Sequence, residues 1–328
     1  MKSAKEYIIL IIVILGLGGY LFFHNTDHTR YKLPVPENIK SADITKIVIN
    51  KKGSNIELKK KDDNWVIMPK AYPADKTKLK SITESLADLT ITAMVSEGEN
   101  DTPYELDPDH QIRVTAFAGD KKVRDVTLGK IAPTYRHTFV RMDGDKKIYH
   151  AKGNLKNTFN KKTDDLRDKG VLSFETADIG KIEIHKGNEA LKLALATPPV
   201  DVNAKDKKSE KKISAADKQP SWLDESGKKI EKKKVDNFIK KLSDLKCASF
   251  VTDKTKKDFS GPIFTAGLSG TKDYSLSIYA KQDEKADKYP AVSSGSDFPF
   301  FLSKYTAEDI MKKLLPEKKE KAGNKSGK

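Results

Sequence analysis

Apolar positions along the chain form one uninterrupted run and, after it, short periodic patterns. The run extends from Tyr7 to Phe23, with the sequence YIILIIVILGLGGYLFF. About 17–25 apolar residues are enough to cross a bilayer as a helix. The run therefore predicts a transmembrane anchor within residues 1–24, followed by a polar, proline-containing tether over residues 25–41.

The orientation of this anchor follows from the charges beside it. Lys2 and Lys5 precede the run. The positive-inside rule therefore places the N-terminus in the cytoplasm and the rest of the chain across the inner membrane, in the periplasm. A cleavable signal peptide is the alternative, with Gly16 and Gly18 as the small residues before the cut. The apolar run continues past both glycines to Phe23, which favours an uncleaved, single-pass anchor.

Beyond the tether, apolar residues alternate with polar ones, which predicts β-strands. The stretches 44–49 and 56–58 enclose a polar turn at 52–55, as in a β-hairpin. A helix follows, with Asp75 as its candidate N-cap. Its buried stripe is predicted at Leu79, Ile82, Leu86 and Leu89. Further alternating stretches over 112–151 complete a first α+β repeat, residues 42–165.

The same order of patterns recurs in the second half of the chain. Ile179, Ile182 and Ile184 repeat the spacing of the first strand, and Trp222 recurs in place of Trp65. The second helical stripe is Val235, Phe238, Leu242 and Leu245. We therefore predict an α+β fold of two tandem repeats after the N-terminal transmembrane helix, each a mainly antiparallel sheet with an amphipathic helix.

The second repeat is assigned to residues 166–315. Within it, residues 198–220 are rich in Lys, Asp, Ala and Ser, which predicts a disordered insertion. The basic residues 316–328 predict a disordered tail. At the junction, Arg167 and Asp168 are expected to tie the two repeats together through a salt bridge or a helix cap.

Composition narrows the choice of partners. The 328 residues carry a formal net charge of +15, and 33% of them are charged. A positive field of this size attracts anionic surfaces such as phospholipid or acidic polysaccharide; the alternative is that the lysines are solvated surface and tail. The predicted topology makes nucleic acid an unsuitable partner. The single cysteine, Cys247, allows no intramolecular disulfide and is expected to be buried.

Residues with catalytic or metal-binding chemistry do not form a recognisable constellation. His24 and His28 lack a third ligand, and the acidic residues at 101–109 lack the spacing of a calcium loop. No phosphate-binding glycine loop or nucleophile turn occurs. We therefore predict no metal, no cofactor and no enzymatic activity. The alternative is an envelope hydrolase that uses His137 or His150 with an acidic partner, in the first repeat alone.

Two groups of residues are candidates for binding. Arg136, His137, Arg141 and Tyr149 lie on one predicted hairpin, where basic and aromatic groups can meet an anion or a sugar. The alternative places Tyr149 in the core and extends the arginines into water. Phe298, Phe300 and Phe301 form an aromatic cluster, which is expected to be either an inter-repeat contact or a partner surface.

The order of these motifs resembles a bacterial family known only as domain of unknown function 4340. The motifs are the apolar N-terminal run, the isoleucine-rich strand, the tryptophan strand, Pro73-Ala74-Asp75, Leu128-Gly129-Lys130 and Leu166-Arg167-Asp168-Lys169. The resemblance implies an envelope protein associated with gliding-motility-type ABC transporter systems, without established activity or catalytic residues.

These inferences together predict a non-enzymatic extracytoplasmic binding or scaffold protein. We expect it to be an accessory component of an envelope ABC-transport system, attached to the membrane by its N-terminal helix and in contact with envelope or transporter proteins. The alternative is recognition of an anionic envelope polymer or lipid by the lysine-rich repeats.

Overall fold

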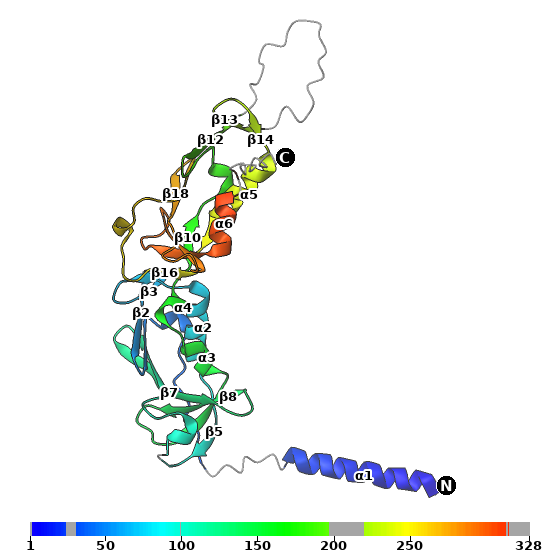
Figure 1. Cartoon of the computed structure of the whole chain (residues 1–328). Coiled ribbons are helices and arrows are strands. Elements are labelled where there is room, and N and C mark those ends of the chain that lie inside the picture. Colours follow the sequence, from blue (N-terminus) through cyan, green and yellow to red (C-terminus); the bar gives the residue numbers. More distant parts are fainter. Residues whose placement is uncertain (1, 24–30, 99, 197–219, 313, 315–328) are drawn as a thin grey trace, which may run out of the picture. The chain divides into compact units, whose positions relative to one another are not determined.

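The chain forms two compact units, Met1–Leu166 and Arg167–Lys328 (Figure 1). The computed structural model describes residues 2–23, 31–98, 100–196, 220–312 and 314. The predicted insertion falls outside the described residues except for Pro220, and so do the predicted tail and the first part of the tether. The predicted start of the second repeat, residue 166, lies beside the boundary between the two units.

The N-terminal apolar run is helical, in α1 (Lys2–Phe23). Among the residues that the structure describes, no helix combines the length and the apolar character needed to cross a membrane. The membrane anchor therefore stays a prediction.

The first unit is built on one nine-stranded sheet. In order across the sheet, its strands are β4 (Tyr72–Pro73), β3 (Asn64–Ile67), β2 (Ser54–Lys61), β1 (Lys46–Lys51), β6 (Ile112–Ala118), β7 (Lys121–Ile131), β8 (His137–Met142), β9 (Ile148–Lys152) and β5 (Ile91–Ser96). Its helices are α2 (Lys76–Ala87), α3 (Leu155–Phe159) and α4 (Thr163–Leu166), with the short 3-10 turns η1 (Ser41–Asp43) and η2 (Thr102–Tyr104).

Helix α2 begins where the sequence predicts. The Asp75 carboxylate accepts hydrogen bonds from the backbone N–H groups of Thr77, at 2.9 Å, and Lys78, at 3.0 Å. These bonds satisfy two of the amides that a helix leaves without an intrahelical partner. Leu79, Ile82 and Leu86 of the predicted stripe are buried on α2, and Leu89 is buried just after the helix ends. Ile47 lies between Leu58 and Ala116 on the strands that flank β1.

The second unit repeats the strand order of the first. Across its nine-stranded sheet, the strands are β14 (Lys229–Ile230), β13 (Ser221–Asp224), β12 (Glu189–Ala196), β11 (Lys181–Lys186), β17 (Phe264–Ser269), β18 (Asp273–Ile278), β19 (Lys288–Ser293), β20 (Phe300–Ser303) and β16 (Ser249–Phe250). It also contains α5 (Lys232–Ser243), α6 (Lys304–Lys312), the turns η3 (Thr176–Asp178) and η5 (Lys256–Asp258), and a small sheet of β10 (Gly170–Ser173) and β15 (Asp244–Lys246).

The register of the two sheets also agrees. Ile182 lies between Leu193 and Leu268, just as Ile47 does between its neighbours. The paired strands of both sheets are antiparallel. The predicted fold class, α+β with two antiparallel repeats and an amphipathic helix in each, is confirmed.

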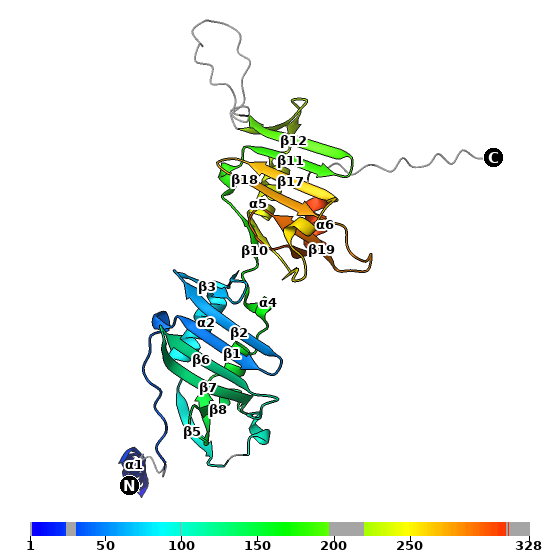
Figure 2. The same ribbon diagram turned by 90° about the vertical axis from the view of Figure 1, so that its left-hand side faces the viewer.

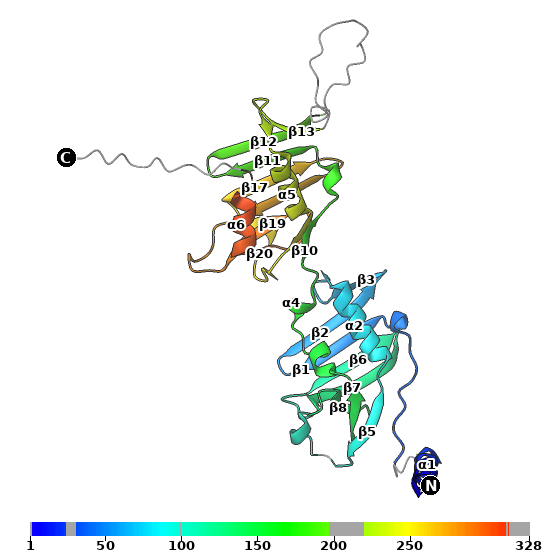
Figure 3. The same ribbon diagram turned by 90° about the vertical axis from the view of Figure 1, so that its right-hand side faces the viewer.

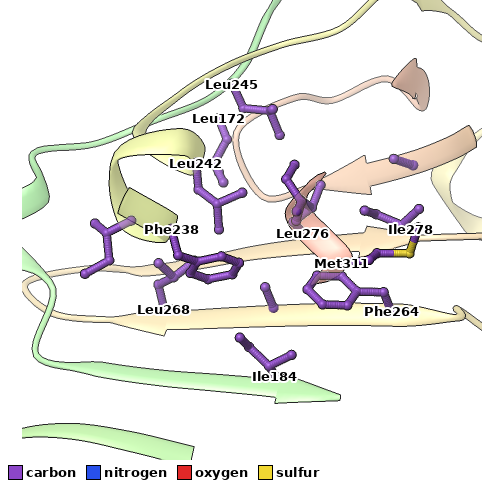
Figure 4. Packing of buried hydrophobic residues seen from close by; sticks show 14 of the residues in the cluster. Leu172, Ile184, Phe238, Leu242, Leu245, Phe264, Leu268, Leu276, Ile278 and Met311 are labelled. Carbon is purple, nitrogen blue, oxygen red and sulfur yellow. The ribbon is translucent and has the colours of Figure 1, made fainter. Parts of the chain in front are cut away.

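In each unit the helices that cover the sheet lie over one face (Figures 2 and 3). The opposite face is open in the second unit, and in the first unit it is partly covered by the segment that contains η2. The core fills the space between these layers. In the second unit, Phe238 and Leu242 of α5 meet Leu268 and Leu276 of the sheet (Figure 4). Cys247 is buried beside this core, as predicted.

Candidate functional site

The predicted binding hairpin of the first unit consists of β8 and β9. Phe139 on β8 lies opposite His150 on β9. Their ring centroids are 4.8 Å apart, and His150 in turn stacks on His137 at 5.4 Å with a 23° angle between the rings. Tyr104 contacts the other side of Phe139 at 4.9 Å. We call these four residues, Tyr104, Phe139, His150 and His137, the histidine row.

The histidine row lies on the face of the sheet opposite to α2, under the segment that contains η2. Phe139 forms a small second core with Leu106, Ala132 and Ile148. The segment approaches the sheet so closely that a Cβ on Gly129 would overlap the carbonyl oxygen of Tyr104. The row is therefore partly enclosed between this segment and the strands.

The His150 ring lies in an apolar, aromatic setting. Burial lowers its pKa, and the nearby His137 lowers it further. Its Nε2 atom is buried and has no hydrogen-bond partner among the described residues. A hydrophobic, aromatic setting of this kind disfavours the charged ring.

Arg141 is engaged by a carboxylate from the covering segment. Its two terminal nitrogens donate to the two oxygens of Asp101, one of them at 3.0 Å. Such a bidentate pair engages both terminal nitrogens, while the buried Nε atom has no hydrogen-bond partner among the described residues. The binding role of Arg141 therefore stays a prediction, and its pairing with Asp101, 40 positions away in the chain, is a feature that the sequence did not indicate.

Tyr149 is part of the core, with 2% of its surface exposed. Its hydroxyl donates to Asp145 at 2.5 Å. Burial, together with this hydrogen bond, raises the pKa of Tyr149 to about 12. The prediction of a binding role for Tyr149 is corrected to the structural alternative, since its side chain points toward the helix layer.

Arg136 is the member of this group that stays exposed. Beside it, at the tip of the turn between β7 and β8, Tyr135 has 76% of its surface exposed and a φ of 58°. Tyr135 directly precedes the candidate binding residues in the sequence. No pattern in the chain indicates that its aromatic ring faces solvent.

The aromatic cluster of the second unit does not form one surface. Phe300 is fully buried, with 0% exposure, opposite Ala291. Phe301 is half-buried and points to the open face, because successive residues on a strand face opposite sides. Phe298 is half-buried against the core. The prediction of Phe300 as a contact residue is therefore wrong.

Arg167 is buried in the second unit, with 2% exposure. Its guanidinium carbon lies 3.3 Å from the ring centroid of Phe250 and 5.0 Å from that of Phe298. Asp168 accepts a hydrogen bond from the backbone of Gly170 at 2.9 Å. These contacts are within the second unit, and the predicted tie between repeats stays a prediction.

The described part of the chain contains no group of three or more His, Cys, Asp or Glu side chains placed to hold a metal ion. Within the acidic stretch at 101–109, Asp107 accepts a hydrogen bond from the ring of His110 at 2.7 Å. This contact is local and exposed.

Comparisons with known proteins give one match. The family model described as Domain of unknown function (DUF4340) matches residues 65–261, more than half of the chain. No curated protein and no solved structure matches this chain. The matched residues include α2 of the first unit, the junction between the units and α5 of the second unit. The chain therefore belongs to the DUF4340 family.

Proposed function

We propose that this protein is a non-enzymatic extracytoplasmic scaffold, an accessory component of an envelope ABC-transport system. In this proposal α1 anchors it in the inner membrane as a single pass, with the N-terminus in the cytoplasm and both units in the periplasm. The units bind envelope or transporter proteins.

The observation that carries the proposal is the open face of the sheet in the second unit. Its outward positions combine small residues, such as Ala194 and Gly267, with the charged residues Lys181, Glu183 and Lys192. A shallow hollow of about 460 Å³ lies there. Residues on its floor and rim include Lys181, Lys192, Ala194, Leu223 and Gly267.

The rim of this hollow carries paired charges. Lys192 lies 3.4 Å from Glu225 and 3.7 Å from Glu183. Exposed pairs of this kind contribute little to stability. They can exchange partners at a protein interface, where a polar rim surrounds a less polar centre.

Photocrosslinking in intact cells tests the proposal. A photoreactive residue is placed at Ala194 on the open face, and the matched control is placed at Asn237 on the exposed side of α5. We expect capture of a transporter subunit or another envelope protein from position 194 and not from position 237. If neither position captures a protein, the scaffold proposal fails.

A second candidate function is recognition of an anionic envelope polymer or lipid. It is favoured by the exposed turn of the first unit that carries Arg136, beside the exposed Lys152 at the end of β9. Both side chains are available to phosphate or carboxylate groups. Binding that weakens steeply with salt would support this candidate.

A further inference from the structure

The turn between β7 and β8 holds an aromatic ring in water at a conformational cost. Tyr135 is 76% exposed and adopts a left-handed backbone conformation, with φ of 58°. Bulky residues rarely adopt this conformation, because the Cβ atom crowds the backbone. The turn is fixed by hydrogen bonds from the Tyr135 amide to Ala132 and from the Ala132 amide to His137, each at 2.8 Å. Tyrosine is therefore held at a tip where glycine or asparagine would be less strained.

Two basic side chains flank this ring. Arg136 follows it in the turn, and Lys152 lies opposite His137 at the end of β9. Both are exposed, and neither forms an ion pair with a described residue. On the helix side, Glu84 of α2 and its C-cap residue Asp88 share a hollow with Lys152. We call Tyr135, Arg136 and Lys152 the cationic turn.

The number of residues between α1 and the sheet limits how far apart the two can lie. Tyr31, the first described residue after α1, accepts a hydrogen bond through its hydroxyl from the Met94 amide on β5, at 3.2 Å. Phe23 and Tyr31 are eight residues apart, so the chain between them spans at most roughly 28 Å. Edge strand β5 therefore stays within that reach of the end of α1.

The cationic turn lies at the start of β8, two strands from the edge strand β5. Met94 is opposite Tyr149, which is opposite Val140. Arg136 is four residues before Val140, which corresponds to about 13 Å along the strand. If α1 crosses the membrane, these distances allow the cationic turn to reach the headgroups.

We propose that the cationic turn docks on the anionic phospholipid surface beside the anchor. The inference rests on the membrane attachment in the proposed function. Tyrosine is suited to the interface, because its ring is apolar and its hydroxyl stays hydrated. Arginine and lysine are attracted by anionic headgroups. The docked turn would fix how the first unit stands on the bilayer.

The equivalent turn of the second unit provides an internal control. It joins β18 and β19 over residues 279–287, and its charges are of both signs: Lys281, Asp283, Glu284, Lys285 and Asp287. Its aromatic residue, Tyr279, packs on Phe259 with centroids 5.1 Å apart. This turn therefore has neither the free ring nor the excess of positive charge.

The test uses the full chain in vesicles of phosphatidylglycerol and phosphatidylcholine. A benzophenone amino acid replaces Tyr135 in one sample and Gln282 in the control, and lipid adducts are counted by mass spectrometry after irradiation. We expect several times more adducts at position 135, enriched in phosphatidylglycerol and reduced by salt. Arg136→Gln and Lys152→Gln should each lower the adduct yield at position 135 about fivefold.

Flotation of the same vesicles separates the two hypotheses. If the chain floats with the vesicles and position 135 gives no more lipid adducts than position 282, the docking inference is wrong while the anchor stands. If the chain does not float, the proposed membrane attachment is wrong, and the docking inference falls with it. Equal capture from pure phosphatidylcholine would overturn the role of the basic residues.

Discussion

The two units share one strand order and register but differ in the chemistry of the open face. In the first unit, Arg113 donates to Asp125 at 2.9 and 2.8 Å, and both Arg113 and Lys122 contact Asp143. The matching positions of the second unit are Thr265, Ser275 and Ser294. An equivalent backbone hydrogen bond identifies these matching positions. The Asp143 amide donates to the Asp125 carbonyl at 3.2 Å in the first unit, and the Ser294 amide donates to the Ser275 carbonyl at 3.0 Å in the second.

This difference shows which positions the fold constrains. Inward positions stay apolar in both units, because they fill the space under the helices. Outward positions contact solvent, so an ion network and a set of hydroxyl groups can occupy the same backbone. The open faces are therefore where the two units can differ in what they bind.

The segments that lead into the two sheets differ as well. In the first unit, buried Arg124 donates to the carbonyl of Leu86 at 3.1 Å and to that of Glu37, in the tether, at 2.9 Å. In the second unit, Tyr274 occupies the equivalent position and packs on Phe174 with centroids 4.7 Å apart. The entering chain is fixed in both units, by hydrogen bonds in one and by ring contact in the other.

The largest effect is expected from the core of the second unit. Phe300→Ala should lower the free energy of unfolding by about 3–5 kcal/mol, because it leaves a cavity opposite Ala291. Phe301→Ala, on the open face, should cost about 1 kcal/mol. Urea unfolding followed by Trp222 fluorescence, in a Trp65→Phe background, measures both. Equal losses would show that the two neighbouring side chains do not face opposite layers.

A smaller effect is expected where the covering segment of the first unit meets the sheet. Gly129→Ala should destabilise this unit by about 1–3 kcal/mol, since the new Cβ forces the backbone at Tyr104 to move. Gly267→Ala is the matched control in the second unit, because its nearest neighbour, the oxygen of Glu183, is 3.9 Å from the Cβ position. The prediction fails if both variants unfold at the same urea concentration as the parent.

The ion network gives a prediction with a pH dependence. Burial raises the pKa of Asp125, but the hydrogen bonds from Arg113 and Lys122 outweigh it and hold the pKa below its usual value. The network therefore stabilises the first unit above the unfolded pKa, about 3.9, and this contribution is lost as pH falls through the lower folded pKa. Asp125→Ser, which copies Ser275, should cost about 1–2 kcal/mol at neutral pH.

Unfolding of the first unit between pH 2 and 7, followed by Trp65 fluorescence, checks this prediction. The parent should lose stability at the acid end of the range, and the Asp125→Ser variant should lose less. Ser275→Ala is the control in the second unit and should leave the acid response of the first unit unchanged. An unaltered acid response in Asp125→Ser would refute the role of the network.

The smallest effect concerns His150, whose place in the second unit is taken by Phe301. Because the folded pKa of His150 is lowered by burial and by His137, the unfolded chain takes up the proton first. The stability of the first unit should therefore fall as pH drops below about 6.5, until the lower folded pKa is passed. His150→Phe should remove this loss. The exposed His185 of the second unit, changed to Phe, is the control.

The sequence by itself determined the duplication, the antiparallel α+β class, the N-cap at Asp75 and the buried stripe of α2. These features depend on neighbours along the chain, on a period of two or of three to four residues, and on apolar side chains that must leave water. The strand and helix patterns of the first half recur in the same order in the second half. Each assignment of an element is therefore supported by two separate stretches of sequence.

Only the tertiary structure decided which candidate residues are free to bind. Arg141 is paired with Asp101, Tyr149 and Phe300 are buried, and Tyr135 is exposed. Each outcome depends on a group brought close by folding: a carboxylate from a distant segment, a helix over one face of a strand, or a turn that points a ring into water. Periodicity fixes the face of a strand on which a residue lies, but the elements that cover each face are set by the fold.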